Sequence, residues 1–173
     1  RKIRVIMETA MSPEDLVEFR EGPGTDHGSK VELVFVGRLV GFKNCEAAIR
    51  ALALVRDARD RVRLTIVGDG PLRQSLRNLA EKLDLTDCIQ FLGTVSHEAH
   101  LRILQHSDIF LFPSLREGGP WSLMEAMAAG LPVICLDTTG MHVITDDACA
   151  IRIPPTTPED TVRAMAEAIE RLV

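Results

Sequence analysis

Hydrophobic and polar positions alternate in two different ways from residue 31 to the end of the chain. Short runs of β-branched and aliphatic residues predict six buried strands, at Val31–Val36, Val62–Val67, Ile89–Leu92, Ile109–Phe112, Val133–Leu136 and Ala150–Ile153. Segments with a helical period of apolar residues lie between them and predict helices at Asn44–Val55, Leu72–Leu83, Glu98–Gln105, Trp121–Ala129 and Glu159–Leu172. Strands that alternate with helices are typical of a parallel sheet with crossover helices. The pattern therefore predicts the α/β class, with a Rossmann-like, doubly wound parallel sheet of about six strands.

The first 30 residues lie outside this alternation. An apolar run at Ile3–Met7 precedes a polar segment that contains Gly22-Pro23-Gly24. Glycine and proline clusters of this kind are typical of loops. We therefore expect residues 1–30 to be a linker and residues 31–173 to form one domain. Because the chain begins without an initiator methionine and ends within a predicted helix, we expect it to be a piece of a longer protein.

The composition argues against several classes of partner. With 173 residues, 46% of them hydrophobic and 26% charged, the chain can bury one sizeable core. A formal charge of -5, 4% aromatic residues and no tyrosine argue against nucleic-acid binding, which relies on basic patches and aromatic stacking. The longest nearly apolar stretch, Ala126–Leu136, is interrupted by Gly130 and Pro132 and is shorter than the roughly 20 residues of a bilayer-spanning helix. We therefore expect a soluble domain.

No metal-binding motif is evident. The cysteines show no Cys-x-x-Cys spacing, and their apolar neighbours favour buried free thiols in a reducing, cytoplasmic setting, at Cys45, Cys88, Cys135 and Cys149. His97, His100 and His106 lie on or beside one predicted helix, but His-Glu-Ala-His differs from the His-Glu-x-x-His of zinc peptidases. We therefore expect these histidines to face solvent or to cap the helix, and we predict no metal site. His142 is expected to be an ordinary histidine of the loop after the fifth strand.

Two cations follow the first predicted strand. Gly37 and Arg38 end that strand, and Lys43 lies at the start of the next helix. In a doubly wound sheet, ligands bind beyond the carboxyl ends of the strands. Arginine makes paired hydrogen bonds to phosphate oxygens and lysine adds a mobile charge, so the two side chains suit a diphosphate. Two solvated surface cations are the alternative interpretation.

The second strand runs into Gly68-Asp69-Gly70-Pro71 and a helix. This segment lacks the third glycine of the dinucleotide-binding fingerprint, and the chain contains no Gly-x-x-x-x-Gly-Lys-[Ser/Thr] phosphate loop. A dehydrogenase with that fingerprint and a P-loop enzyme are therefore not supported. A tight strand-to-helix turn and a ligand contact explain these glycines equally well.

The segment after the fourth strand combines a helix start with two carboxylates. Pro120 can pre-set the first turn, whose amides lack partners within the helix and suit an anion, at Trp121, Ser122 and Leu123. Glu117 precedes these amides and Glu125 follows them by about one turn, so the two acids can flank one ligand. Carboxylates accept hydrogen bonds from hydroxyl groups, and a diphosphate with a sugar at each end would satisfy every group. A helix-dipole role for Glu117 and simple exposure of Glu125 are the alternatives.

Five motifs in this chain together resemble the C-terminal, donor-binding domain of retaining glycosyltransferases with the GT-B fold, in glycosyltransferase family four. The resemblance covers about residues 31–173. It rests on Val36-Gly37-Arg38-Leu39 with Lys43-Asn44, on Ile66–Pro71, on Phe91–Val95, on Ser107–Ser114, and on the glutamate pair that leads into Ala126–Ile134. Pro120 stands where the family usually has glycine. Because proline has no N–H, phosphate contacts would rest on the amides after it.

The resemblance implies a role for each candidate residue. Residues that match Arg38 and Lys43, next to Gly37, bind the diphosphate of the donor. The residue that matches Glu117 contacts hydroxyl groups of the transferred sugar, and the one that matches Glu125 binds the ribose. The loop that contains Val95 packs against the base. Further donor contacts are expected from the helix start, at Trp121, Ser122 and Leu123.

The resemblance also implies a reaction and a missing partner. A sugar passes from a UDP- or GDP-linked donor to an acceptor with retention of configuration, without a metal or another cofactor, and Arg38, Lys43 and Glu117 are the expected catalytic residues. Enzymes of this fold have two Rossmann-like domains, and the acceptor-binding N-terminal domain lies outside this chain. We therefore expect the chain alone to be inactive, with any membrane contact made by the missing domain. A sugar-nucleotide epimerase or hydrolase of the same fold, and a non-catalytic sugar-nucleotide-binding module, are the alternatives.

Overall fold

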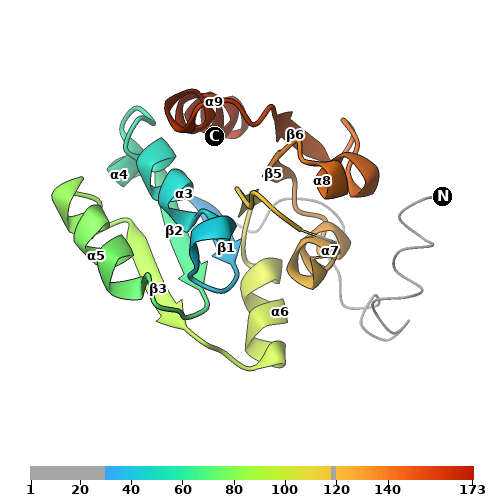
Figure 1. Cartoon of the computed structure of the whole chain (residues 1–173). Coiled ribbons are helices and arrows are strands. Elements are labelled where there is room, and N and C mark those ends of the chain that lie inside the picture. The colour runs from blue at the N-terminus through green and yellow to red at the C-terminus, as the bar shows by residue number, and fades with distance from the viewer. Residues whose placement is uncertain (1–29, 118–119) are drawn as a thin grey trace.

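The computed structural model describes residues 30–117 and 120–173 (Figure 1). Within them, six parallel strands form one sheet in the order β3-β2-β1-β4-β5-β6. The strands are β1 Val31–Val36, β2 Val62–Val67, β3 Ile89–Gly93, β4 Ile109–Phe112, β5 Val133–Leu136 and β6 Ala150–Ile153. This is the strand order of a doubly wound sheet made of two βαβαβ halves. The predicted fold class is confirmed.

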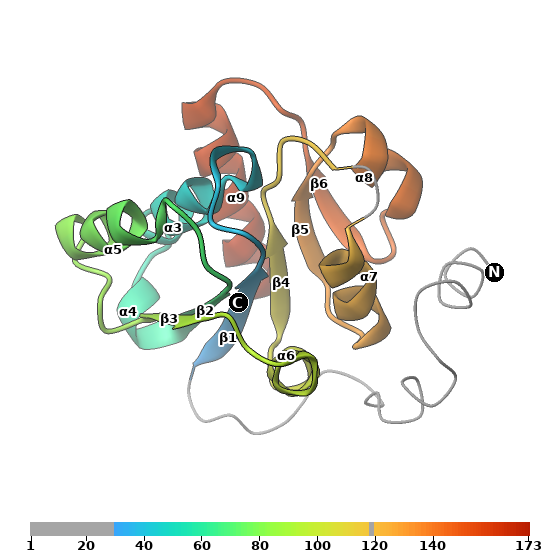
Figure 2. The ribbon, with the colours of Figure 1, turned by 60° about the horizontal axis from the view of Figure 1, so that its bottom comes forward.

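Helices cover both faces of the sheet. The described residues form the 3-10 helix η1 Gly41–Lys43 and the α-helices α3 Cys45–Leu52, α4 Ala58–Arg61, α5 Arg73–Lys82, α6 His97–Gln105, α7 Trp121–Ala128, α8 Thr139–Ile144 and α9 Pro158–Leu172. Helices α3, α5 and α9 pack on one face, whereas α6 and α7 pack on the other (Figure 2). None of these helices combines the length and the hydropathy that a crossing of the bilayer requires.

Alternation along the strands divides the core between the two faces. In β1, Leu33 and Phe35 belong to a cluster with α3, α5 and α9, whereas Val34 and Val36 belong to a second cluster with α6 and α7. All four side chains are at most 9% exposed. Successive residues of a strand point to opposite faces, so a strand covered on both sides is apolar at every position. The continuous apolar runs in the sequence have this cause.

The structure departs from the predicted elements mainly in short segments. Five strands have the predicted bounds, and β3 is one residue longer, to Gly93. The predicted helix Asn44–Val55 is wrong at both ends, because Asn44 adopts a left-handed conformation with φ of 53° and α3 ends at Leu52. Helices η1, α4 and α8 were not predicted. They have three to six residues, too few to show a helical period.

Two helices begin at side-chain caps. The Thr157 hydroxyl accepts a hydrogen bond from the Asp160 amide at 3.1 Å, and Pro158 occupies the first turn of α9. In α6, the Ser96 hydroxyl accepts from the Ala99 amide at 3.2 Å. Each cap satisfies a backbone donor that has no partner within the helix.

The four cysteines are free thiols, as predicted. Three of them are buried, and Cys149 is partly exposed. Burial raises the pKa of the Cys45 thiol to about 12. It also raises the pKa of Cys135 to about 11, which keeps both thiols protonated at neutral pH.

Candidate functional site

The central strands β1 and β4 lie side by side, and the chain leaves them toward opposite faces of the sheet. After β1 the chain enters α3 on one face, and after β4 it enters α7 on the other. In a doubly wound sheet this is the topological switch point, where ligands bind beyond the carboxyl ends of the strands. Segments 37–43 and 114–125, which hold most of the predicted site residues, both start at this edge.

The loop after β1 packs closely against the loop after β2. The Gly37 amide donates to the Val67 carbonyl at 3.0 Å. A Cβ atom at Gly68 would lie 2.0 Å from the Gly37 carbonyl oxygen, and one at Gly70 would lie 2.5 Å from that of Leu39. Gly68 also has φ of 124°, a conformation that favours glycine. The two glycines are thus explained by backbone contact, which favours the tight-turn interpretation.

Lys43 and Glu117 form an ion pair that joins the two segments. The Lys43 Nζ donates to Glu117 Oε1, and the two side chains are 17% and 11% exposed. The Ser114 hydroxyl donates to the same oxygen at 2.7 Å. The Lys43 ammonium also lies 5.7 Å from the ring centres of Phe42 and Phe112, within cation–π range. Lys43 is therefore fixed beside Glu117, although 74 residues separate them in the sequence.

Arg38 differs from Lys43 in its surroundings. Its side chain is exposed, and no carboxylate in the described part of the chain forms an ion pair with it. A guanidinium without a carboxylate partner is available to an anionic ligand. The structure therefore places one paired and one unpaired cation beyond β1.

The start of helix α7 leaves fewer amides without a partner within the helix than the sequence predicts. Pro120 is the N-cap, and the Leu123 amide donates to the Pro120 carbonyl at 3.1 Å. The expectation that the Leu123 amide lacks a partner is therefore wrong, because a tight first turn satisfies it. The amides of Trp121 and Ser122 precede the first bonds within the helix. The Ser122 hydroxyl lies 3.5 Å from the Val36 carbonyl oxygen, which brings this helix start to the end of β1.

Glu125 is buried between α7 and α6, with 9% of the residue exposed. The simple-exposure alternative for this residue is therefore wrong. His97 Nδ1 and His100 Nε2 each lie 3.6 Å from one of its two carboxylate oxygens, beyond ordinary hydrogen-bond distance. Burial, and then the neighbouring His97, lowers the pKa of His100, so this imidazole is neutral at pH 7.

The histidines near α6 fulfil the sequence expectation only in part. His97 is 67% exposed, and His106 is the C-cap residue of α6, as expected. His100 is largely buried, so the expectation that it faces solvent or caps the helix is wrong. The packing of α7 on α6 buries it, and that packing has no local signal in the sequence.

Val95 follows β3 and packs against the cluster on the α6 and α7 face. Glu125 lies on the same face. The described structure therefore arranges the predicted residues in two groups. Lys43 and Glu117 meet beyond β1 and β4, whereas Val95 and Glu125 lie on the side that α6 covers.

The segment after β5 is a helix, so the expectation of a loop at His142 is wrong. His142 lies on α8, and its Nδ1 is 3.0 Å from Oδ1 of Asp137. A Cβ atom at Gly140 would lie 2.6 Å from the carbonyl oxygen of Glu117. The start of α8 therefore packs tightly against the loop that carries Glu117. A small residue at position 140 is the one sequence signal of this contact.

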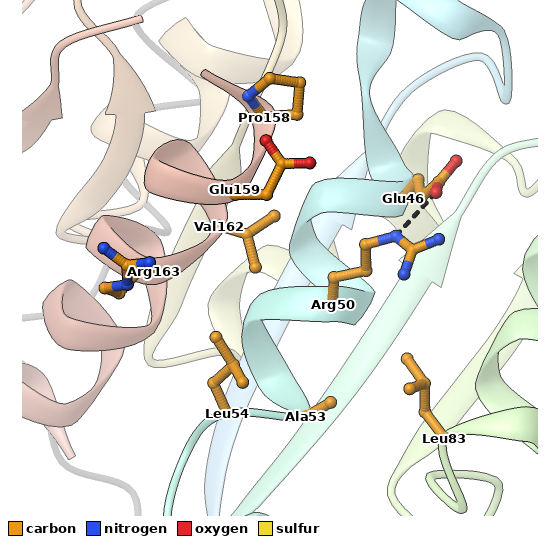
Figure 3. Close-up of a pocket in the computed structure, with 9 residues that line it drawn as sticks. All are labelled: Glu46, Arg50, Ala53, Leu54, Leu83, Pro158, Glu159, Val162 and Arg163. Atoms are coloured by element: carbon orange, nitrogen blue, oxygen red, sulfur yellow. Dashed lines mark hydrogen bonds and ion pairs between the residues drawn. The ribbon is translucent and has the colours of Figure 1, made fainter. Parts of the chain in front are cut away.

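A groove lies between α3 and α9, on the face of the sheet away from α6 and α7, and Leu83 also lines it (Figure 3). Its wall includes the ion pair between Arg50 and Glu46, at 2.7 Å, and the apolar side chains of Leu54 and Val162. None of the predicted site residues lines it. The candidate site at the switch point is therefore separate from this groove.

Comparison with known proteins supports one family. The model of the glycosyl transferases group 1 family matches residues 18–171. A glycosyltransferase of Methanocaldococcus jannaschii is 31% identical over 150 residues, and the putative colanic acid biosynthesis glycosyltransferase WcaL of Escherichia coli is 32% identical over 160 residues. The alignments cover 86% and 88% of this chain but only 38% of each relative. The chain thus spans well under half the length of these curated relatives.

The solved structures agree with the sequence comparison. The pneumococcal O-GlcNAc transferase GtfA, in complex with UDP and GlcNAc, matches with a TM-score of 0.75 and 25% identity. The match covers 82% of this chain and 28% of that one. These findings confirm the resemblance to glycosyltransferases of the GT-B fold. Since the family match extends over most of the sequence, the chain belongs to group 1 of the glycosyl transferases.

Proposed function

We propose that this chain is the donor-binding half of a retaining glycosyltransferase that uses a UDP- or GDP-linked sugar. The observation that carries the proposal is that Lys43 pairs with Glu117 at the switch point, where Arg38 follows β1 and the start of α7 lies against the end of the same strand. Cations and a helix start suit a diphosphate, and a carboxylate suits sugar hydroxyls. The UDP complex of the related O-GlcNAc transferase GtfA supports a nucleotide ligand of this class.

The two groups of residues suggest how the donor lies. Arg38, Lys43 and the first two amides of α7 bind the diphosphate, beside the Gly37 backbone. Glu117 contacts the transferred sugar. Glu125 and Val95 lie on the α6 and α7 face, which fits the ribose and the base on that side. A donor that extends from one group to the other would place its diphosphate between the two carboxylates.

The ion pair between Lys43 and Glu117 is the arrangement of these side chains before a donor binds. When a diphosphate binds, the Lys43 ammonium exchanges a carboxylate partner for phosphate oxygens. The Glu117 carboxylate then becomes available to hydroxyl groups of the sugar, while its hydrogen bond from Ser114 keeps it in place. The pair thus holds both side chains in position before the donor binds. Less side-chain conformational entropy is then lost on binding.

The proposed reaction breaks the bond between the sugar C1 and the donor phosphate oxygen, and forms a bond from C1 to the acceptor oxygen on the same face. The proton of the acceptor hydroxyl passes to the departing phosphate. Arg38, Lys43 and the helix start stabilise the charge that develops on the leaving diphosphate. This route requires no metal and no further cofactor.

The chain requires a partner domain for transfer. Because it spans 38% of the relatives named above, we propose that an N-terminal domain of the same protein binds the acceptor and makes any membrane contact. A site open on one side cannot exclude water or orient an acceptor. The chain alone should therefore bind the nucleotide and transfer nothing. The proposed linker at residues 1–30 lies almost wholly outside the described residues.

Calorimetric titration of the purified chain with UDP, GDP and NAD tests the donor site. We expect saturable one-to-one binding of UDP or GDP and none of NAD. Absence of binding to both diphosphates would overturn the proposal. In a longer protein that contains this chain, the product should keep the anomeric configuration of the donor, which NMR of the anomeric proton reports. Inversion would contradict the retaining mechanism.

A further inference from the structure

Two histidines and a glutamate from different helices converge beside the proposed nucleotide site. His97 and His100 lie three residues apart on α6, a spacing that puts both on one face, and Glu125 comes from α7. One ligand atom of each side chain lies within 4.8 Å of the other two. The two imidazole-to-carboxylate distances are both 3.6 Å. Nothing in the sugar-transfer scheme uses either histidine.

His100 has an unsatisfied nitrogen that points to a missing ligand. Its Nε2 atom is buried and has no hydrogen-bond partner among the described residues. A buried polar atom of this kind is costly unless something binds it. An imidazole nitrogen that carries no proton offers a lone pair to such a ligand.

The spacing of the three donors fits a metal ion better than a hydrogen bond. At 3.6 Å a nitrogen and an oxygen are too far apart to bond directly. Each imidazole faces a different oxygen of the Glu125 carboxylate, and with metal bonds of about 2.0–2.1 Å a nitrogen and an oxygen at this separation subtend an angle of roughly 120° at an ion. His97 is mostly exposed, so it can adjust its position and leaves a path for an ion to enter.

The donor set indicates which ion. Two imidazoles and one carboxylate suit Zn²⁺, whereas Mg²⁺ and Ca²⁺ prefer oxygen ligands. We propose that His97, His100 and Glu125 form a zinc site, with a fourth position open to water. The sequence did not indicate this site, because its histidine spacing differs from the zinc-peptidase motif and the third ligand comes from another helix of the fold.

Zinc at this site opposes nucleotide binding, an inference that rests on the proposed function. Glu125 is the proposed acceptor of hydrogen bonds from the ribose. A carboxylate that coordinates zinc has less capacity to accept these bonds, so zinc and the nucleotide oppose each other's binding. Such coupling is reciprocal, and each ligand weakens the other by the same factor. Zinc is then an inhibitor of donor binding and takes no part in sugar transfer.

Titration of the purified, reduced chain with ZnCl₂ tests the site. We expect one ion per chain, and loss of this binding in both His97→Ala and His100→Ala. His97 is exposed, so its variant keeps the test decisive even if His100→Ala fails to fold. His142→Ala is the matched control, because His142 also lies beside a carboxylate, that of Asp137, but no second histidine of the described residues joins them. It should bind zinc like the unmodified chain.

Co²⁺ as a second probe identifies the ligands. Nitrogen and oxygen donors should produce visible bands of tetrahedral cobalt without the near-ultraviolet charge-transfer band of a thiolate. A thiolate band, no saturable binding, or binding that His97→Ala leaves unchanged would overturn the site.

Titration with UDP, in zinc-free buffer and in saturating zinc, tests the coupling. Zinc should weaken UDP binding in the unmodified chain and leave it unchanged in His97→Ala. Equal UDP affinity in both buffers would overturn the coupling. Failure of both UDP and GDP to bind in zinc-free buffer would overturn the proposed function, while the zinc titration would still decide the zinc site.

Discussion

Replacement of Lys43 by methionine separates the ligand role of this side chain from its structural role. Methionine keeps roughly the length of the side chain but removes the ammonium that pairs with Glu117 and lies 5.7 Å from the centre of the Phe112 ring. We expect Lys43→Met to weaken UDP or GDP binding and to leave binding of the corresponding nucleoside unchanged. The reason is that the nucleoside has no phosphate for this charge to contact.

The magnitude follows from the exchange of partners. A hydrogen bond between charged groups contributes about 1.5 to 3 kcal/mol, which corresponds to a factor of roughly 10 to 150 in the dissociation constant. In the free protein Lys43 already pairs with Glu117, so binding replaces one anionic partner by another. We therefore expect the lower end of this range, a loss of about tenfold.

Glu117→Gln is the matched control, because it breaks the same ion pair from the other side. It keeps the Lys43 charge and frees it from its partner, so diphosphate binding should stay the same or become tighter. Calorimetry with the diphosphate and the nucleoside, together with urea unfolding of each variant, provides the comparison. If both variants lose diphosphate affinity to the same extent, the ion pair only supports the loops and the assignment of Lys43 as a phosphate ligand is wrong.

Three further predictions concern the ribose contact, the glycine turn and the thiols. Glu125→Gln should weaken binding of the nucleoside as well as the diphosphate, by about 1 kcal/mol or fivefold, whereas Glu117→Gln should leave nucleoside binding unchanged; equal effects in a calorimetric titration would contradict the two roles. Gly68→Ala should destabilise the fold by about 2 kcal/mol or more, because its Cβ atom would lie 2.0 Å from the Gly37 carbonyl oxygen. Gly41→Ala, where no atom lies within 4 Å of the added Cβ, should unfold at nearly the unmodified urea concentration, and a similar loss in both would refute the steric argument. At pH 8, a thiol reagent should modify the partly exposed Cys149 first and leave Cys45 untouched, because burial raises the pKa of Cys45 to about 12. Mass spectrometry of the digested protein measures the order of modification, and modification of Cys45 before Cys149 would contradict this prediction.

The local sequence pattern was sufficient to predict the strands of the sheet and the start of α9. Strands buried on both faces need apolar residues at successive positions, so Leu33–Val36 of β1 and the whole of β4 appear as continuous apolar runs. Thr157 and Pro158 mark the start of α9 because a helix needs a cap within its first turn. The order of motifs also identified the family, and with it the residues of the switch point.

The contacts between side chains could not be predicted from the sequence. Lys43 and Glu117 are 74 residues apart in the sequence, and their pairing depends on the side-by-side placement of β1 and β4. The burial of His100 against Glu125 depends on α7 packing over α6, and the fit of Gly140 against the Glu117 carbonyl depends on α8. Hydrophobic periodicity reports which face of an element is buried but not which element covers it. For this reason the sequence determined the sheet and the residues at its edge, while the tertiary structure alone decided their partners.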